Sequence, residues 1–170
     1  MTLGVGLAAA DDALIKSGAY ITNAAGCAAC HNSPDGTPFA GGLVLKTPFG
    51  PMATPNITSD KETGIGEWTF EDFQNALHKG INKDGEPLYP AMPYVHYTLM
   101  RDDDLKAVWA YVQTIKPVSN TVDVNQLAFP FDVRASLYVW RARYFTDERF
   151  QPDSNESDEW NRGAYIIKAL

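Results

Sequence analysis

The sequence lacks the features that mark several large classes of protein. It has only two cysteines among 170 residues, and both lie in one short motif, which leaves no thiols for a disulfide framework. No cluster of lysine and arginine occurs and the net charge is −7, so we expect no nucleic-acid partner. The apolar runs are too short to span a bilayer. With 45% hydrophobic residues, the chain is expected to fold as one domain, or as one domain with a short addition.

The two cysteines belong to the run Cys27-Ala28-Ala29-Cys30-His31. The pattern C-x-x-C-H is the attachment signature of a c-type haem. On a helix, residues three and four apart share one face, so both thiols and the imidazole point to the same side. The motif predicts one haem c, bound covalently by Cys27 and Cys30, with His31 as the proximal iron ligand.

Three alternatives to haem remain open for this motif. A thioredoxin-like dithiol would require an activated thiolate after a strand, and the Ala-rich surroundings favour a helix instead. A zinc site could use Cys27 and Cys30 together with His78 and His96, but the spacing between the two pairs is long and irregular. The third alternative is a chance occurrence.

A haem iron bound by His31 has a sixth position, for which the candidates are Met52, Met92, Met100, His78 and His96. Met92 is favoured because Pro90 and Pro93 restrict the backbone on both sides of it. A thioether ligand favours reduced iron and raises the reduction potential. His96 is the next candidate. The other ring nitrogen of His31 should donate to an acceptor, which we expect to be a backbone carbonyl near Pro34 or Pro38.

Apolar and aromatic residues near these motifs are candidates for the wall of a haem pocket, although each is equally compatible with an ordinary core position. They are Trp68, Phe73, Leu88, Tyr89, Pro90 and Tyr94. Hydrogen-bond donors to the haem propionates could come from Asn56, Thr58 and Trp68.

Local patterns predict helices over 13–30, 70–79 and from 102–104 to Pro117, with a shorter one over 134–145. Thr69 and Asp72 have the spacing of a capping box, and Gly80 is placed as a helix stop. Residues 32–66 contain five prolines and are expected to form a long loop with at most one small hairpin. The fold class expected is therefore all-α, with three to five helices and long loops around one haem.

Composition divides the chain into four expected parts. Residues 1–10 have the character of a signal-peptide remnant or an apolar extension, 11–145 form the haem domain, and 146–158 are an acidic linker. Gly163-Ala164-Tyr165-Ile166 repeats Gly18-Ala19-Tyr20-Ile21 at an offset of 145. We therefore expect residues 159–170 to begin a second, truncated haem module.

Several clustered motifs together resemble one family. The sequence is similar to the first haem module of the three-haem cytochrome c subunit of membrane-bound dehydrogenases, which oxidise alcohols, aldehydes, gluconate or related sugar acids. The resemblance covers nearly all of residues 13–170, and its motifs are the C-x-x-C-H run, Pro38–Gly42, Thr47–Gly50, Asn56–Thr58, Asp60–Gly66, Leu88–Tyr94 and Glu159–Tyr165.

The resemblance implies a class I-like cytochrome c domain, with Cys27 and Cys30 attached to haem and with His31 and Met92 as axial ligands. It implies electron transfer rather than substrate catalysis, from a PQQ- or FAD-dependent catalytic subunit toward ubiquinone or another cytochrome. The implied location is the periplasm, at the outer face of the cytoplasmic membrane, with membrane association through the full-length protein or its complex. An alternative function is a haem enzyme or gas sensor with an open iron site.

Overall fold

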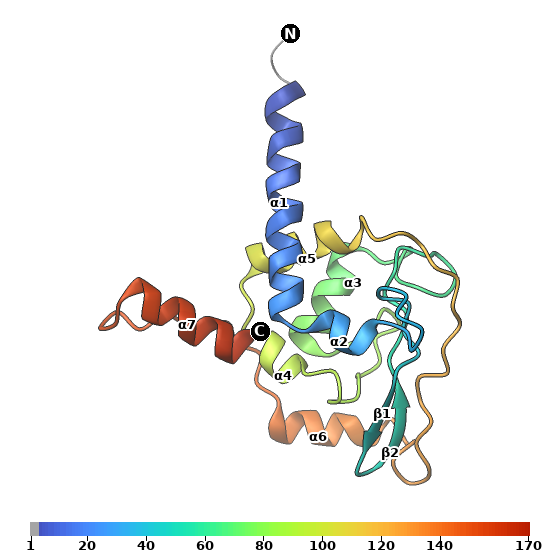
Figure 1. Cartoon of the computed structure of the whole chain (residues 1–170). Coiled ribbons are helices and arrows are strands. Elements are labelled where there is room, and N and C mark those ends of the chain that lie inside the picture. Colours follow the sequence, from blue (N-terminus) through green and yellow to red (C-terminus); the bar gives the residue numbers. More distant parts are fainter. Residues whose placement is uncertain (1–3) are drawn as a thin grey trace.

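The computed structural model describes the backbone of residues 4–170 and the side chains from residue 11 onward. In this part of the chain there are seven α-helices, one π-helical turn and one two-stranded sheet (Figure 1). The expected all-α class is confirmed, although the helices are more numerous and shorter than predicted. The predicted extension over 1–10 falls partly on residues 1–3, which lie outside the described part. None of the described helices is both long and apolar enough to cross a membrane.

The helix predicted over 13–30 is two helices. Helix α1 covers Gly4–Ala24 and helix α2 covers Cys27–His31. Gly26 lies between them with φ +68°, in the left-handed region that glycine adopts without a steric penalty. This break turns α2 away from the axis of α1, whose N-terminal turns project from the body of the molecule (Figure 1).

Helix α5, Asp102–Val112, packs across α1 at the centre of the main hydrophobic core. The contact requires Gly18, because a Cβ there would lie 1.9 Å from the carbonyl oxygen of Ala107. The prediction that this helix runs to Pro117 was too long. Beyond Val112 the backbone makes tighter bonds, in which Thr114 N–H donates to Tyr111 O and Ile115 N–H to Val112 O.

The helix predicted over 70–79 is present but changes its winding. Helix α3, Phe70–Gln74, continues into the π-helical turn η1, Asn75–Lys79. The predicted capping box is confirmed: Thr69 Oγ1 accepts from Asp72 N–H, and Asp72 Oδ2 accepts from Thr69 N–H. The predicted stop at Gly80 is also confirmed, with φ +58°.

The proline-rich loop contains the one hairpin allowed for in the sequence. Strands β1, Val44–Thr47, and β2, Gly50–Ala53, pair antiparallel with Leu45 opposite Met52. After β2 the loop is held by Asn56, whose Nδ2 donates to Val118 O at 2.7 Å and to Thr63 Oγ1 at 3.0 Å. These bonds fix the loop against the chain that follows α5.

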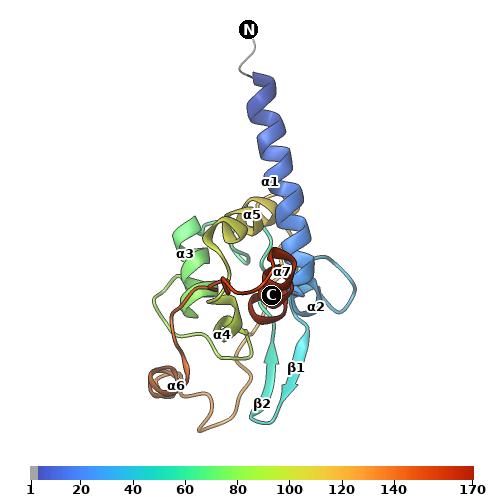
Figure 2. The same cartoon turned by 90° about the vertical axis from the view of Figure 1, so that its left-hand side faces the viewer.

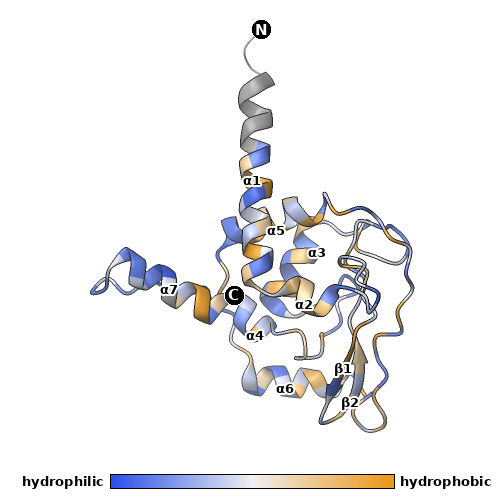
Figure 3. Ribbon diagram, in the orientation of Figure 1, coloured by the Kyte–Doolittle hydropathy of each residue, from blue (hydrophilic) through white to orange (hydrophobic). Residues whose placement is uncertain are grey.

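The last third of the chain wraps around the domain (Figure 2). The short helix α4, Tyr94–Tyr97, was not predicted, whereas α6, Ser136–Tyr144, lies within the helix predicted over 134–145. Helix α7, Asp158–Ala169, extends to the side, with polar residues at its outer end and hydrophobic ones toward its C-terminus (Figure 3).

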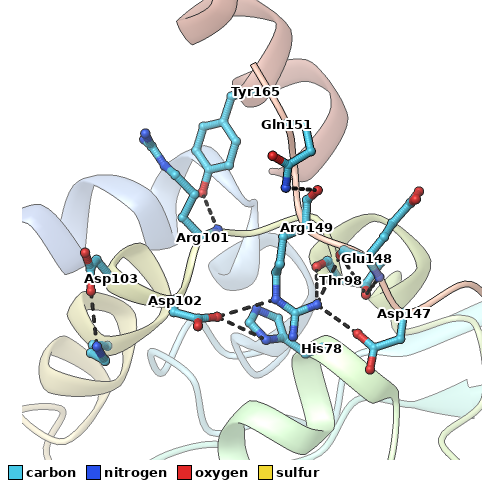
Figure 4. Close-up of polar contacts among 11 residues, drawn as sticks. His78, Thr98, Arg101, Asp102, Asp103, Asp147, Glu148, Arg149, Gln151 and Tyr165 are labelled. Atoms are coloured by element: carbon cyan, nitrogen blue, oxygen red, sulfur yellow. Dashed lines mark hydrogen bonds and ion pairs between the residues drawn. The ribbon is translucent and has the colours of Figure 1, made fainter. Parts of the chain in front are cut away.

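The segment predicted to be an acidic linker has no regular structure before α7, but it is docked on the domain. Arg149 Nη1 donates to Thr98 O and to Asp147 Oδ1, both at 2.9 Å, and its Nε lies 3.4 Å from Asp102 Oδ1 (Figure 4).

Candidate haem-binding site

The two cysteines lie one turn apart on α2, and both are partly exposed. Burial of the sulfur, together with the nearby Cys30 thiol, raises the pKa of Cys27 to about 11, so the thiol is protonated at neutral pH. A redox dithiol depends on a lowered thiol pKa. The environment of Cys27 therefore disfavours the dithiol alternative.

His31 is buried at the end of α2, with its ring held in one orientation. Its Nδ1 lies 2.9 Å from the carbonyl oxygen of Pro55, to which it donates. Burial lowers the pKa of the imidazole, so the ring is neutral and Nε2 keeps its lone pair. The predicted backbone acceptor exists, but it is Pro55 rather than a carbonyl near Pro34 or Pro38. The reason is that His31 O accepts from Gly41 N–H at 2.7 Å, which brings the chain around Pro55 onto the ring.

Met92 lies at the edge of the same hydrophobic cluster as Cys27. It is partly exposed, and its backbone is sharply turned, with Met92 N–H donating to Tyr89 O and Met92 O accepting from Tyr94 N–H at 2.8 Å. The other methionines with described side chains differ in position. Met100 is 1% exposed in the core, and Met52 belongs to a separate cluster on the hairpin.

The residues present fit a c-type haem. Cys27, Trp68, Leu88 and Met92 are apolar side chains that border the buried core yet remain partly uncovered by protein. Cys30 lies on the same helical turn as Cys27. The neutral imidazole of His31 follows it, with Nδ1 already bonded to Pro55 O. Two thiols, an oriented imidazole and a thioether are the donor set of a covalently bound haem with His and Met axial ligands.

The structure separates part of the predicted pocket from this cluster. Trp68 packs against it, but Tyr89 lies in the cluster of Met52, with its hydroxyl donating to Phe131 O at 3.0 Å. Tyr94 is fully buried against Trp140 and Phe145, and Pro90 is partly exposed on the loop between the two tyrosines.

The two predicted propionate donors near the loop are already engaged. Asn56 donates one amide hydrogen to Thr63 Oγ1 within the loop and the other to Val118 O beyond α5, and Thr58 Oγ1 lies 2.8 Å from Asn56 Oδ1 and 3.4 Å from Val118 O. Both side chains hold the loop against the chain that follows α5.

Tyr97 is a site residue that the sequence did not indicate. Its hydroxyl donates to Ala25 O at 2.8 Å, just before the attachment motif. Burial, reinforced by Cys27 and Cys30, raises the pKa of this phenol. No local pattern could reveal the contact, because 72 residues separate the two partners.

The residues proposed for a zinc site do not come together. Across the part of the chain with described side chains, no three His, Cys, Asp or Glu residues form a metal-binding group. His78 is fully buried between Asp102 and Arg149, whereas His96 is exposed on α4 (Figure 4).

Comparison with known proteins gives consistent matches. The profile of the family described as Cytochrome c matches residues 15–116. The chain is 42% identical over 163 residues, or 95% of its length, to the gluconate 2-dehydrogenase cytochrome c subunit of Pantoea cypripedii. It is 44% identical over 159 residues, or 92% of its length, to the fructose dehydrogenase cytochrome subunit of Gluconobacter japonicus. It is 42% identical over 160 residues, or 93% of its length, to the cytochrome c subunit of the alcohol dehydrogenase (quinone) of Gluconobacter oxydans.

These relatives are much longer than the chain. The match spans 37% of the gluconate 2-dehydrogenase subunit, 33% of the fructose dehydrogenase subunit and 34% of the alcohol dehydrogenase subunit. The sequence thus corresponds to one part of each relative.

Proposed function

Because the chain belongs to the cytochrome c family, we propose that it transfers electrons through one haem c, attached by Cys27 and Cys30 and ligated by His31 and Met92. The observation that supports this most directly is that Met92 lies in the same hydrophobic cluster as Cys27, which begins the short helix that carries the oriented His31 ring.

The surrounding residues have distinct roles in this function. The bound haem supplies one-electron chemistry at its iron. Pro55 O holds the imidazole of His31 through Nδ1, and the restricted backbone around Met92 holds the thioether. The apolar side chains of Trp68 and Leu88 exclude water from the site. Side chains held in this way would move little when a bound haem changes oxidation state, which would favour rapid electron transfer.

The distal ligand can be tested by replacing methionines one at a time. We expect Met92→Ala to remove the sulfur-to-iron charge-transfer band from the optical spectrum of the oxidised protein. Met52→Ala is the matched control, because Met52 lies in the other cluster, and this variant should retain the band. A band that survives in the Met92→Ala protein would exclude Met92 as the ligand.

The alternative of a haem enzyme or gas sensor predicts a different behaviour. An open or weakly ligated iron would bind carbon monoxide rapidly in the reduced, unmodified protein. With Met92 bound, we expect slow binding, limited by dissociation of the thioether. Rapid binding would favour the alternative and count against electron transfer as the function.

The names of the relatives support a proposal for the partner. These relatives are named as cytochrome subunits of gluconate, fructose and quinone-type alcohol dehydrogenases. We propose that this chain receives electrons from a catalytic dehydrogenase subunit of the PQQ or FAD type and passes them toward ubiquinone or another cytochrome. The proposed location is the periplasmic face of the cytoplasmic membrane. Reduction of the haem on mixing with the purified catalytic subunit and its substrate would test the first step.

The structure also supports the proposal that residues 159–170 begin a second haem module. In α1, Gly18 contacts α5 and Thr22 is 1% exposed. At the equivalent positions of α7, Gly163 has open space around it and Ile167 is 85% exposed. A face that is buried in α1 is therefore uncovered in α7. Haem stoichiometry of the protein expressed from its complete reading frame would test this, since more than one haem per chain is expected.

A further inference from the structure

The segment of residues 127–145, here called the strap, lies outside the region that matches the cytochrome c profile, which ends at residue 116. It includes α6 and packs against the loop that presents Met92 (Figure 1). The strap contacts this loop on both sides of the methionine, through two arginines and the two tyrosines that the sequence placed in the haem pocket.

On the N-terminal side of Met92 the strap holds Tyr89. The Tyr89 hydroxyl donates to Phe131 O at 3.0 Å, and the Arg134 guanidinium lies 5.3 Å from the centre of the Tyr89 ring. Arg134 Nη1 also donates to Pro87 O at 3.0 Å, and its Nε lies 3.5 Å from Glu86 Oε2. Arg134 therefore contacts three residues of the loop over residues 86–94, which carries Met92 and is here called the methionine loop.

On the C-terminal side the strap holds Tyr94, which is fully buried. Trp140 and Phe145 pack edge-on against its ring, with centroids 6.3 and 5.5 Å away, and Arg141 lies 5.5 Å from its centre. The opposite support is Gly80, where a Cβ would come within 2.5 Å of the ring. Tyr94 thus has no room to shift without displacing the strap.

Arg141 connects this aromatic group to the end of the π-helical turn. Its Nη1 donates to Lys79 O and lies 3.5 Å from Gly80 O, the carbonyls that η1 leaves without helical partners at its end. Leu88 N–H in turn donates to Gly80 O at 2.8 Å, which ties the start of the methionine loop to the same point.

We infer that Arg134 and Arg141 are positioning residues for the distal ligand, holding the methionine loop closed so that Met92 stays on the iron. This inference rests on the proposed function, in which Met92 is that ligand. A thioether is a soft ligand that other ligands can displace, so its retention depends on the loop that carries it. With Tyr89 and Tyr94 fixed three residues before and two residues after Met92, the loop cannot open without breaking contacts to both arginines.

Competition with imidazole in the oxidised holoprotein measures this directly, because imidazole must displace the methionine. We expect Arg141→Ala to bind imidazole about tenfold more tightly, as loss of a cation–π contact and a hydrogen bond of ordinary strength would give, and to weaken the charge-transfer band. Arg134→Ala should act in the same direction. Arg141→Lys keeps a hydrogen-bond donor but loses the planar guanidinium group. Its imidazole affinity should therefore lie between that of the unmodified protein and that of Arg141→Ala.

Arg143→Ala is the matched control, since Arg143 is on the same helix, is exposed, and makes no hydrogen bond, ion pair or cation–π contact with the methionine loop among the described residues. Its imidazole affinity should equal that of the unmodified protein. Thermal unfolding of each variant separates a loss of overall stability from a loss of the hold on Met92. A purely structural role would lower the unfolding temperature without changing imidazole affinity.

Unchanged imidazole affinity and an unchanged band in both Arg141→Ala and Arg134→Ala would overturn the inference, provided that Met92→Ala loses the band. If Met92→Ala retains its band, the ligand assignment itself fails and the inference falls with it. Should Arg141→Ala not fold, Arg134→Ala and Tyr89→Phe decide the question with the same two measurements.

Discussion

At the scale of single residues, His78 is a buried titratable group that the electron-transfer site does not use. Its side chain is fully buried, and within the described structure neither ring nitrogen has a hydrogen-bond partner. Asp102 Oδ1 lies 3.8 Å from Nδ1, with Arg149 and Asp147 nearby (Figure 4). Burial and the charge of Arg149 lower the pKa of His78 below its ordinary value of 6.5, despite the opposing effect of Asp102.

A neutral buried histidine predicts a specific pH dependence of stability. The unfolded chain binds a proton near pH 6.5 and the folded protein only at lower pH, so unfolding becomes easier as the pH falls below 6.5. Above pH 6.5 this contribution is constant. The free energy of unfolding, measured in urea, should be lower at pH 5 than at pH 7.5, and this difference should be smaller in His78→Gln. Equal losses in the two proteins would contradict the prediction.

Gly80 and Gly85 offer a residue-scale test of steric packing. Both have positive φ, +58° and +80°, so alanine is strained by about 1–2 kcal/mol at either position. Only at Gly80 would the added Cβ also meet the Tyr94 ring at 2.5 Å. We expect Gly80→Ala to lower the free energy of unfolding by about 1–3 kcal/mol more than Gly85→Ala, measured by urea unfolding. Similar losses would mean that the Tyr94 ring moves aside freely.

At the scale of secondary-structure elements, the sequence predicts what local chemistry determines. The capping box at Thr69, the stop at Gly80 and the attachment turn at Cys27 each depend on residues within a few positions, and each is found where it was expected. The break at Gly26 and the early end of α5 were missed. Both lie inside apolar patterns of helical spacing, and their geometry depends on packing between elements.

The candidate site shows the same division. The two thiols and His31 follow from one motif, and Met92 from the prolines around it. The acceptor of His31 is 24 residues away, and Tyr97 reaches Ala25 across 72 residues. Tyr89 and Tyr94 were candidates for the haem pocket and equally for ordinary core positions. The strap, which no local pattern connects to them, takes both side chains into its own contacts.

The repeated Gly-Ala-Tyr-Ile sequence gives a matched pair of helix substitutions. Gly18→Ala would place a Cβ 1.9 Å from Ala107 O and force α1 and α5 apart. We expect Gly18→Ala to lower the free energy of unfolding by about 3 kcal/mol or more. Gly163→Ala meets no atom within 4 Å and should stabilise α7 by about 0.5–1 kcal/mol, because alanine has the higher helix propensity. Thermal unfolding of this chain measures both, and a destabilising Gly163→Ala would show that α7 is already covered.

At the scale of the whole molecule, the chain is organised around one main hydrophobic cluster and one smaller cluster. The main cluster, which contains α1, α3 and α5, is bordered by partly exposed Cys27, Trp68, Leu88 and Met92. The smaller cluster joins the hairpin to the strap. A group bound at the border of the main cluster would therefore contribute to the stability of the whole domain.

Preventing haem attachment tests this dependence. The double variant Cys27→Ser, Cys30→Ser cannot form the thioether bonds, and the border side chains would then stay in contact with water. Burial of each such side chain contributes about 1.5–3 kcal/mol, so we expect the free energy of unfolding to fall by more than about 3 kcal/mol, with increased binding of a hydrophobic dye. Ala28→Ser, on the same helical turn, leaves attachment possible and should change neither measurement appreciably. A double variant as stable as the haem-bound protein would show that the core is complete without the haem.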